Sequence, residues 1–272
     1  MNIESSLQNK YLELKKYLSS LNSVAVAYSS GVDSTFLLKT AVDTLPRDNV
    51  LALTAKSHSF PKRELDESIQ FCKSENIRQI VFESEELSID GFSNNPPDRC
   101  YICKKELFSK IKGIARENNI NAVVEGSNAD DINDYRPGMR AVTELEILSP
   151  LKKVGLTKNE IRALSKQLGL KTWNKQSFAC LSSRFVYGEK ITVQKLDMID
   201  KSEQLLLDLG FKQVRVRIHN DVARIEVLPN EIERVMQFKD TIYSKFKEYG
   251  FRYVTLDLGG YRTGSMNDSL NI

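Results

Sequence analysis

The stretch Ser29-Ser30-Gly31-Val32-Asp33-Ser34 decides the fold that we expect for this chain, because of what surrounds it. It directly follows the apolar run 24–28, and Pro46 and a second apolar run, 50–53, come after it. Between the loop and Pro46, apolar side chains recur on one helical stripe, made by Val32, Phe36, Leu37, Ala41 and Leu45. The pattern predicts a strand, a loop of small residues, a helix and a second strand, which together form a βαβ unit.

The alternation of strand and helix patterns continues through the first two-thirds of the chain. Further short apolar runs occur at 79–82, 122–124 and 145–148. Helical patterns lie between them and after them, carried by Leu65, Ile69 and Cys72, by Leu107, Phe108, Ile111 and Ala115, and by Ile161, Leu164 and Leu168 behind a Thr157–Glu160 capping box. We therefore expect the α/β fold class, with a doubly wound parallel sheet, and we expect Cys72 in its core.

The pattern changes at about Thr192. A helix over 196–209 precedes the alternating runs 214–218 and 223–227, which flank an Asn220-Asp221 turn and predict a hairpin. A helix around 231–249 and a strand at 252–256 follow. We expect a nucleotide-binding domain over 1–175, a cysteine-bearing loop over 176–191, and a second, smaller α+β domain over 192–272 that binds substrate and mediates oligomerisation.

The loop at 29–34 has the chemistry of a phosphate site. A strand that runs into a helix through small residues points backbone N–H groups and the positive helix end at an anion. Gly31 permits close approach, the serines offer hydroxyl groups, and Asp33 can cap the helix or hold Mg²⁺. A serine-rich capped turn is the alternative, but the loop ends the first strand, where such sheets bind ligands. The segment 125–131 ends a later strand and is expected at the same edge.

This loop resembles the S-G-G-x-D-S motif of the PP-loop ATP pyrophosphatases, whose fold is that of the adenine nucleotide alpha hydrolases and which cleave ATP between its α and β phosphates. It lacks the lysine of a Walker A loop. Ser30 replaces the first glycine, a change that serine tolerates where φ need not be positive. The resemblance implies ATP contacts at Ala27, Ser29, Ser30, Gly31, Val32, Asp33, Ser34 and Gly126, with Asp33 as a catalytic residue.

Three cysteines suggest sulfur or metal chemistry. Cys100 and Cys103 form a C-x-x-C before a helix, and Cys180 lies in the later loop. Three cysteines match a [4Fe-4S] cluster with one open iron, whereas a structural zinc site needs four ligands. The alternatives are a redox pair with Cys180 as a sulfur-carrying nucleophile, or three unrelated reduced thiols.

Arginines suggest an anion site in the second domain. Arg215 and Arg217 share one face of a strand, Arg184 follows Cys180 closely, and Arg262 lies in a glycine-rich turn. Arginine suits phosphate or carboxylate recognition. The alternative for Arg215 and Arg217 is a solvated strand face with Arg224 and Glu226 as cross-strand partners.

Several segments together resemble the LarE family over essentially the whole chain: the loop, 133–138, Trp173-Asn174-Lys175, Ser182 to Phe185 and 252–260. The resemblance implies an ATP-dependent sulfur transferase that adenylylates the carboxylates of pyridinium-3,5-biscarboxylic acid mononucleotide and converts them to thiocarboxylates in nickel-pincer nucleotide synthesis. It implies catalytic Cys180, a [4Fe-4S] cluster on Cys100, Cys103 and Cys180 whose open iron carries the extra sulfide, and substrate contacts at Arg184, Arg215, Arg217, Glu226 and Arg262. Ser265 stands where a basic residue can occur. Some members instead use one cysteine as a sacrificial sulfur donor.

Composition limits the partners. The 272 residues carry 39 basic and 36 acidic side chains, so no strong field draws the chain to nucleic acid. No apolar run approaches the roughly 20 residues of a membrane span, and four cysteines are too few for a disulfide scaffold. We expect a cytoplasmic homo-oligomer that works with other enzymes of nickel-pincer nucleotide synthesis. A PP-loop tRNA thiolase is the closest rival, but it would add zinc-finger cysteines or a basic RNA-binding domain.

Overall fold

The computed structural model describes residues 3–133, 137–262 and 264–265. Of the 133–138 stretch used above, residues 134–136 lie outside this described part. The chain forms two compact units. The first unit holds residues up to Ser57, Lys62–Ser84 and Cys100–Ser177; the second holds His58–Pro61, Glu85–Arg99 and the chain from Phe178 onward.

A parallel sheet of four strands forms the centre of the first unit. The strands are β1 (Val24–Ala27), β2 (Val50–Lys56), β3 (Gln79–Glu83) and β4 (Ala122–Val124), in the order β3-β2-β1-β4. Strand β1 therefore lies between two strands that the chain reaches in opposite directions, which is the arrangement of a doubly wound sheet. The predicted fold class is confirmed.

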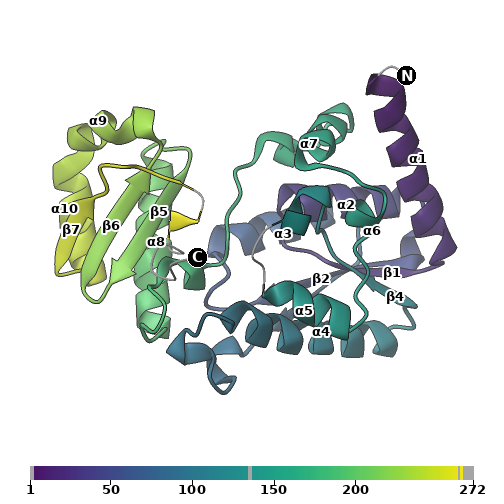
Figure 1. Cartoon of the computed structure of the whole chain (residues 1–272), viewed down its shortest axis with the longest axis horizontal. Coiled ribbons are helices and arrows are strands. Elements are labelled where there is room, and N and C mark those ends of the chain that lie inside the picture. The colour runs from purple at the N-terminus through teal and green to yellow at the C-terminus, as the bar shows by residue number, and fades with distance from the viewer. Residues whose placement is uncertain (1–2, 134–136, 263, 266–272) are drawn as a thin grey trace. The chain divides into compact units, whose positions relative to one another are not determined.

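Helices cover both faces of this sheet (Figure 1). One face carries α4 (Arg99–Glu117) and α5 (Gly138–Glu144), and the apolar cluster there includes Phe108, Ile111 and Val142. The cluster on the other face is built from α1, α2, α3, α6 and α7. These helices span Ile3–Ser20, Val32–Val42, Lys62–Ser74, Pro150–Lys153 and Lys158–Gln167.

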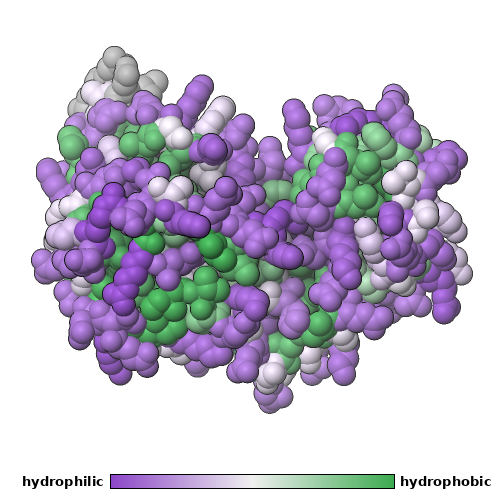
Figure 2. Space-filling model, turned by 180° about the vertical axis from the view of Figure 1, so that it is seen from behind, coloured by the Kyte–Doolittle hydropathy of each residue, from purple (hydrophilic) through white to green (hydrophobic). Residues whose placement is uncertain are grey.

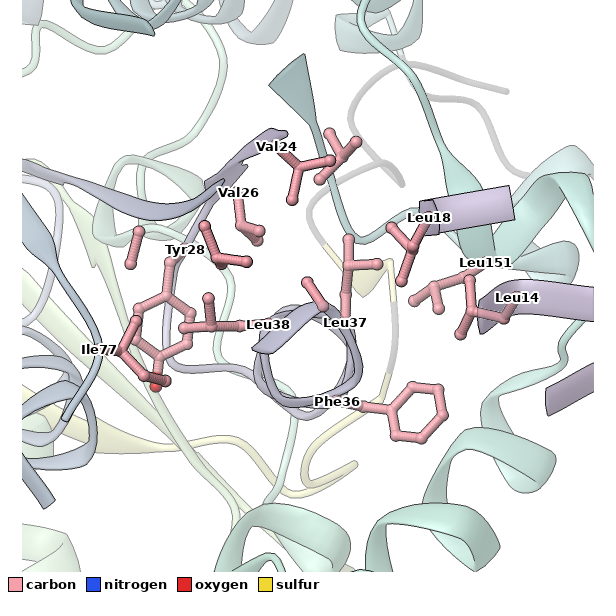
Figure 3. Close-up of a cluster of buried hydrophobic side chains, with 14 of the residues drawn as sticks. Leu14, Leu18, Val24, Val26, Tyr28, Phe36, Leu37, Leu38, Ile77 and Leu151 are labelled. Carbon is pink, nitrogen blue, oxygen red and sulfur yellow. The ribbon is translucent and has the colours of Figure 1, made fainter. Parts of the chain in front are cut away.

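Helix α2 lies at the centre of that second cluster. Figure 3 shows Leu37 and Leu38 of α2 directed toward Val24 and Val26 of β1, with Leu151 of α6 nearby. The whole predicted stripe of α2 is buried, at 9% exposure or less. Burial of one such apolar side chain contributes roughly 1.5–3 kcal/mol, so the helix that begins at the phosphate loop is firmly held.

Cys72 packs in the same cluster at 2% exposure, as predicted, and burial raises the pKa of its thiol to about 12. The buried face of α3, however, is made by Glu64, Ser68 and Cys72. The prediction of Leu65 and Ile69 as core residues was wrong, since Ile69 is 42% exposed. The buried positions, Glu64 and Ser68, each lie one residue earlier in the helix. An acidic side chain takes the inward position because it has partners there, which are described below.

The predicted strand at 145–148 was also wrong. Only Leu148 pairs with β4, through a single bridge to Val124. The backbone of Glu146 is left-handed, with φ 55, and this interrupts the extended run. The Thr157–Glu160 capping box at the start of α7 is confirmed, with both of its reciprocal hydrogen bonds present.

The second unit contains a mixed sheet of three strands in the order β5-β6-β7. Strands β5 (Val214–His219) and β6 (Val222–Val227) form the predicted hairpin, and Asn220 in its turn has φ 56. Strand β7 (Tyr253–Leu256) runs parallel to β6. The helices are α8 (Val193–Asp208), α9 (Ile232–Val235) and α10 (Lys239–Tyr249), the last two in place of one continuous predicted helix.

The segment expected as a separate loop at 176–191 belongs largely to this second unit. Its residues Leu181 and Phe185 are buried, and Phe185 bridges to Ile218 of β5. Backbone hydrogen bonds from Leu181 to Ser59 and from Ile191 to Ser93 tie it to the two early segments that group with the second unit. These pairings join residues far apart in the sequence, so each unit is made of several separate stretches of the chain.

Polar and charged residues cover most of the face drawn in Figure 2. Within the described residues, no helix has the length and apolar character needed to cross a membrane.

Candidate active site

The phosphate loop joins β1 to α2 as predicted. Gly31 is the N-cap of α2, with φ −72 and ψ 168, and its carbonyl accepts a hydrogen bond from Thr35 N at 2.9 Å. The N–H groups of the first turn of α2 therefore point out of the helix end, where they can bind an anion. The hydroxyls of Ser29 and Ser34 lie 3.2 Å apart across the loop. The local structure is that of a phosphate-binding turn.

Ser30 occupies a conformation that usually requires glycine. Its φ is 51, so the serine replaces glycine at a position with positive φ, contrary to the expectation of a tolerant site. The side chain is 1% exposed, and its Oγ donates to Glu64, whose Oε2 and carbonyl oxygen lie 3.0 and 3.1 Å away. These hydrogen bonds offset the cost of the left-handed backbone, roughly 1–2 kcal/mol for an L-residue.

Asp33 forms an ion pair that the sequence did not indicate. Lys158 Nζ, at the start of α7, lies 2.5 Å from Asp33 Oδ2. Burial raises the pKa of Asp33 even though Lys158 acts to lower it. Among the described residues, Asp33 Oδ1 is buried without a hydrogen-bond partner. One carboxylate oxygen thus remains able to bind a cation, which fits a Mg²⁺ ligand.

Gly126 lies directly against this loop. A Cβ added to Gly126 would come within 3.1 Å of Ser34 N and 3.3 Å of Ser34 Cα, so a larger residue would push the loop backbone away by a few tenths of an ångström. Its neighbour Glu125 is 7% exposed and accepts hydrogen bonds from Ser127 and Ser149. The segment after β4 therefore reaches the same sheet edge as the loop after β1, as predicted from their shared position after parallel strands.

The other three cysteines, Cys100, Cys103 and Cys180, have different surroundings from Cys72. Cys100 and Cys103 stand in the first two turns of α4, three residues apart and so on the same side of the helix. Cys100 and Cys180 are exposed, and Cys103 is half-buried. Cys100 and Cys103 belong to the first unit, and Cys180 belongs to the second. Within the described residues, no group of three His, Cys, Asp or Glu side chains is gathered for metal binding, so the cluster stays a prediction.

The predicted arginines of the second unit are buried rather than solvated. Arg184, Arg215 and Arg217 are at most 5% exposed, and Glu226 is fully buried. Arg217 contacts Glu226 at 3.0 Å. The alternative of a solvated face for Arg215 and Arg217 is therefore wrong, because both side chains are buried, although Glu226 is a cross-strand partner as that alternative expected.

Arg184 uses all of its donor nitrogens on protein groups. Its Nε and Nη2 donate to the two oxygens of Glu203 at 2.7 and 2.8 Å. Its Nη1 donates to the carbonyls of Ala179 and Cys180 and to Ser183 Oγ. Burial disfavours the Glu203 carboxylate, yet Arg184 holds its pKa below the usual range. This pair fixes the backbone that carries Cys180.

Arg215 has a different environment. Its guanidinium lies over the rings of Phe178 and Tyr261, with 5.4 and 5.1 Å to their centroids. Burial, reinforced by Arg184, lowers the pKa of Arg215 to about 10. A charge destabilised in this way favours an incoming anion, because the anion would restore the lost stabilisation.

Ser265 lies in the cluster of Arg217 and Glu226, at the place where the family resemblance allows a basic residue. Its hydroxyl accepts from Arg217 Nη2 and donates to Glu226 Oε1, both at 3.0 Å. Arg262, the fifth predicted substrate residue, is exposed. Glu203 was missed by sequence reasoning, although an acidic residue in the apolar stripe of Leu196, Ile199 and Leu206 on α8 was the available signal.

The strand order and the loop define an α/β enzyme domain of the PP-loop fold. Argininosuccinate synthase of Natronomonas pharaonis is 23% identical over 165 residues, which cover 56% of this chain and 40% of that enzyme, and this likeness bears on the fold alone. No family model matches the chain.

Full-length relatives are more similar. The chain is 41% identical over 266 residues to the pyridinium-3,5-bisthiocarboxylic acid mononucleotide synthase of Lactiplantibacillus plantarum, covering 98% of this chain and 96% of that protein. An uncharacterized protein of Synechocystis sp. is 40% identical, with 97% of this chain and 98% of that protein covered. One of Methanocaldococcus jannaschii is 31% identical, with 88% and 91% covered. The chain belongs to the family of the bisthiocarboxylic acid mononucleotide synthase, the LarE family, and the expectation of an enzyme of the sulfurtransferase class is confirmed.

Proposed function

We propose that this chain is an ATP-dependent sulfur transferase that adenylylates the carboxylates of pyridinium-3,5-biscarboxylic acid mononucleotide and converts them to thiocarboxylates. The observation that carries the proposal is the 41% identity, over 98% of the chain, to a synthase named for the bisthiocarboxylic product. The phosphate loop at the start of α2 supports the use of ATP.

In the first stage, the loop binds ATP and a substrate carboxylate attacks the α-phosphorus. The α–β phosphoanhydride bond breaks, pyrophosphate leaves, and an acyl-adenylate forms. The N–H groups of the first turn of α2 stabilise the phosphate charge, and Asp33 Oδ1 is the oxygen available to hold Mg²⁺ beside it. Lys158 keeps the other oxygen of Asp33 in place.

In the second stage, sulfur replaces AMP on the acyl carbon. Cys100, Cys103 and Cys180 would hold a [4Fe-4S] cluster, since Cys100 and Cys180 are exposed and Cys103 is half-buried, whereas Cys72 is buried. When bound, the cluster would supply an open iron at which sulfur can be carried. Arg184 holds the Cys180 backbone and so positions its thiol.

The substrate phosphate is assigned to Arg215 and Arg217. The cluster of the second unit holds three buried arginines and two buried glutamates, which leaves one positive charge in excess for an anion. Arg184 is bound to Glu203 on two sides, so we assign it a positioning role. Glu226 would orient the ribose or pyridinium ring, and the exposed Arg262 is a further contact for the substrate. We also propose that the chain forms a homo-oligomer and works with other enzymes of nickel-pincer nucleotide synthesis.

An assay of product release, with one candidate acceptor supplied at a time, tests the reaction. Purified chain with ATP and the pyridinium biscarboxylic mononucleotide is expected to release AMP and pyrophosphate, and Asp33→Ala to abolish this release. Unmodified tRNA in place of the mononucleotide is expected to give none. Release with tRNA alone would replace the proposal with the tRNA thiolase alternative.

Iron and sulfide analysis of anaerobically purified protein tests the source of sulfur. We expect iron and acid-labile sulfide in the wild type and their loss in Cys103→Ala. Active protein without iron would instead make Cys180 a sacrificial donor, which mass spectrometry would detect as its conversion to dehydroalanine, with the loss of one sulfur atom per chain after a single turnover.

A further inference from the structure

Lys175 meets the phosphate loop at the point where the glycine pattern is broken. Its Nζ lies 3.2 Å from the carbonyl oxygen of Ser30 and 3.3 Å from Ser30 Oγ. The same ammonium contacts Glu64 Oε2 at 2.7 Å and Glu67 Oε2 at 2.5 Å. The Lys175 and Glu64 side chains are only 13% and 6% exposed, so their contact is shielded from water, whereas Glu67 is 51% exposed.

The contact with the Ser30 carbonyl sets the direction of the next N–H group. In a trans peptide the C=O and the N–H point in opposite directions. Lys175 holds the C=O of Ser30, and this orients the N–H of Gly31 away from the lysine. The left-handed φ of Ser30 and the hydrogen bonds of its side chain to Glu64 fix the residue that carries this carbonyl group.

Lys175 could either bind a phosphate of the nucleotide or orient the backbone of the loop, and the surrounding charges decide between these two roles. A lysine that binds phosphate must have its charge free, but here two carboxylates lie within 2.7 Å of one ammonium. Glu64 also lies 4.0 Å from Arg63 Nε, so the group of Lys175, Arg63, Glu64 and Glu67 carries no net charge, and no positive charge is in excess to attract a phosphate. Lys175 therefore acts on the loop backbone rather than on the nucleotide.

We propose that Lys175 is a positioning residue of the nucleotide site, which orients the Ser30–Gly31 peptide so that the loop N–H groups face the phosphates of ATP. This inference rests on the proposed function. It gives a role to the Trp173-Asn174-Lys175 stretch, for which sequence resemblance supplied none. It also explains why a buried glutamate takes the inward position on α3.

Direct binding of an ATP analogue with a methylene group between the α and β phosphates tests the inference by calorimetry. Lys175→Met is expected to weaken its Kd about tenfold, since misorienting one N–H donor loses about 1.4 kcal/mol. Lys39→Met is the matched control, because Lys39 also lies between two carboxylates, Asp43 and Glu75, each at 3.0 Å. Lys39 stands near the far end of α2, roughly 10 Å along the helix from Val32, and its variant is expected to bind as the wild type does.

A second variant keeps the test valid if Lys175→Met leaves Glu64 unpaired and fails to fold. Lys175→Met combined with Glu64→Gln removes both buried charges, and the same tenfold loss is expected. Wild-type affinity in a folded Lys175 variant, or an equal loss in Lys39→Met, overturns the inference alone. A wild-type chain that binds no analogue overturns the proposed function as well.

Discussion

At the scale of single residues, the half-buried Asp33 and the buried Glu64 and Glu203 each lie beside a basic side chain. Asp33 pairs with Lys158, Glu64 with Lys175, and Glu203 with Arg184. A buried carboxylate without its partner would cost several kcal/mol, so these pairs are required once the acids are inside. Two of the three acids contribute to the phosphate loop and the third to the Cys180 segment.

Substitution of Ser30 separates backbone strain from hydrogen bonding. Ser30→Ala keeps the left-handed strain and loses the bonds to Glu64, so we expect a loss of about 1–3 kcal/mol in the free energy of unfolding. Ser30→Gly loses the same bonds but relieves the strain, and it should be the more stable of the two variants. Urea unfolding measures both, and an alanine variant as stable as the glycine variant would contradict this account.

Asp33 predicts a pH dependence of stability. Burial raises its folded-state pKa above the ordinary value, so the folded chain binds this proton more tightly than the unfolded chain does. The contribution of Asp33 to stability therefore falls as the pH rises from about 4 through the raised pKa. Asp33→Asn removes this change, and its stability relative to the wild type should increase over that range. Urea titrations at several pH values would show no such trend if the pKa were not raised.

At the scale of elements, the Arg184–Glu203 pair connects three parts of the second unit. Arg184 lies in the segment that carries Cys180, Glu203 belongs to α8, and Glu203 Oε1 also accepts from the backbone N of Val216 in β5 at 3.0 Å. One ion pair thus fixes a loop, a helix and a strand. The loop is positioned by this pair together with the backbone pairings of Leu181 and Phe185.

Arg184→Lys tests this connection. Lysine keeps the charge but cannot make the two-sided contact with Glu203 and reach the carbonyls as well. We expect a loss of about 2–4 kcal/mol in the free energy of unfolding and faster alkylation of Cys180 by iodoacetamide. Arg252→Lys, at a 70% exposed side chain, is the control and should change neither. An unchanged alkylation rate in Arg184→Lys would argue against a positioning role.

At the scale of the whole molecule, the two units carry different chemistry. The first holds the phosphate loop, Lys158 and Lys175, and the second holds the arginine cluster. Each unit should therefore control the binding of a different reactant. Kinetic constants for ATP and for the pyridinium mononucleotide can be separated by substitution in one unit at a time.

Arg215→Met provides that separation. Removing this guanidinium is expected to raise KM for the mononucleotide at least tenfold, because the excess positive charge of the cluster is lost, while KM for ATP stays within twofold. Arg252→Met should leave both constants unchanged. The measurement is pyrophosphate release at varied concentrations of each reactant. An equal rise in both constants would show that Arg215 does not act on the mononucleotide specifically.

The sequence alone determined the features that depend on neighbouring residues. These were the βαβ unit around the loop, the stripe of α2, the hairpin with its Asn220 turn and the capping box of α7, because periodicity and turn chemistry are local. Only the tertiary structure decided the partners of buried charges. The positive φ of Ser30, the inward turn of Glu64, the roles of Lys158, Lys175 and Glu203, and the burial of the arginines all depend on contacts between residues distant in the chain. Such contacts leave no local period, and so the sequence could predict candidate site residues but not the buried partners that hold them.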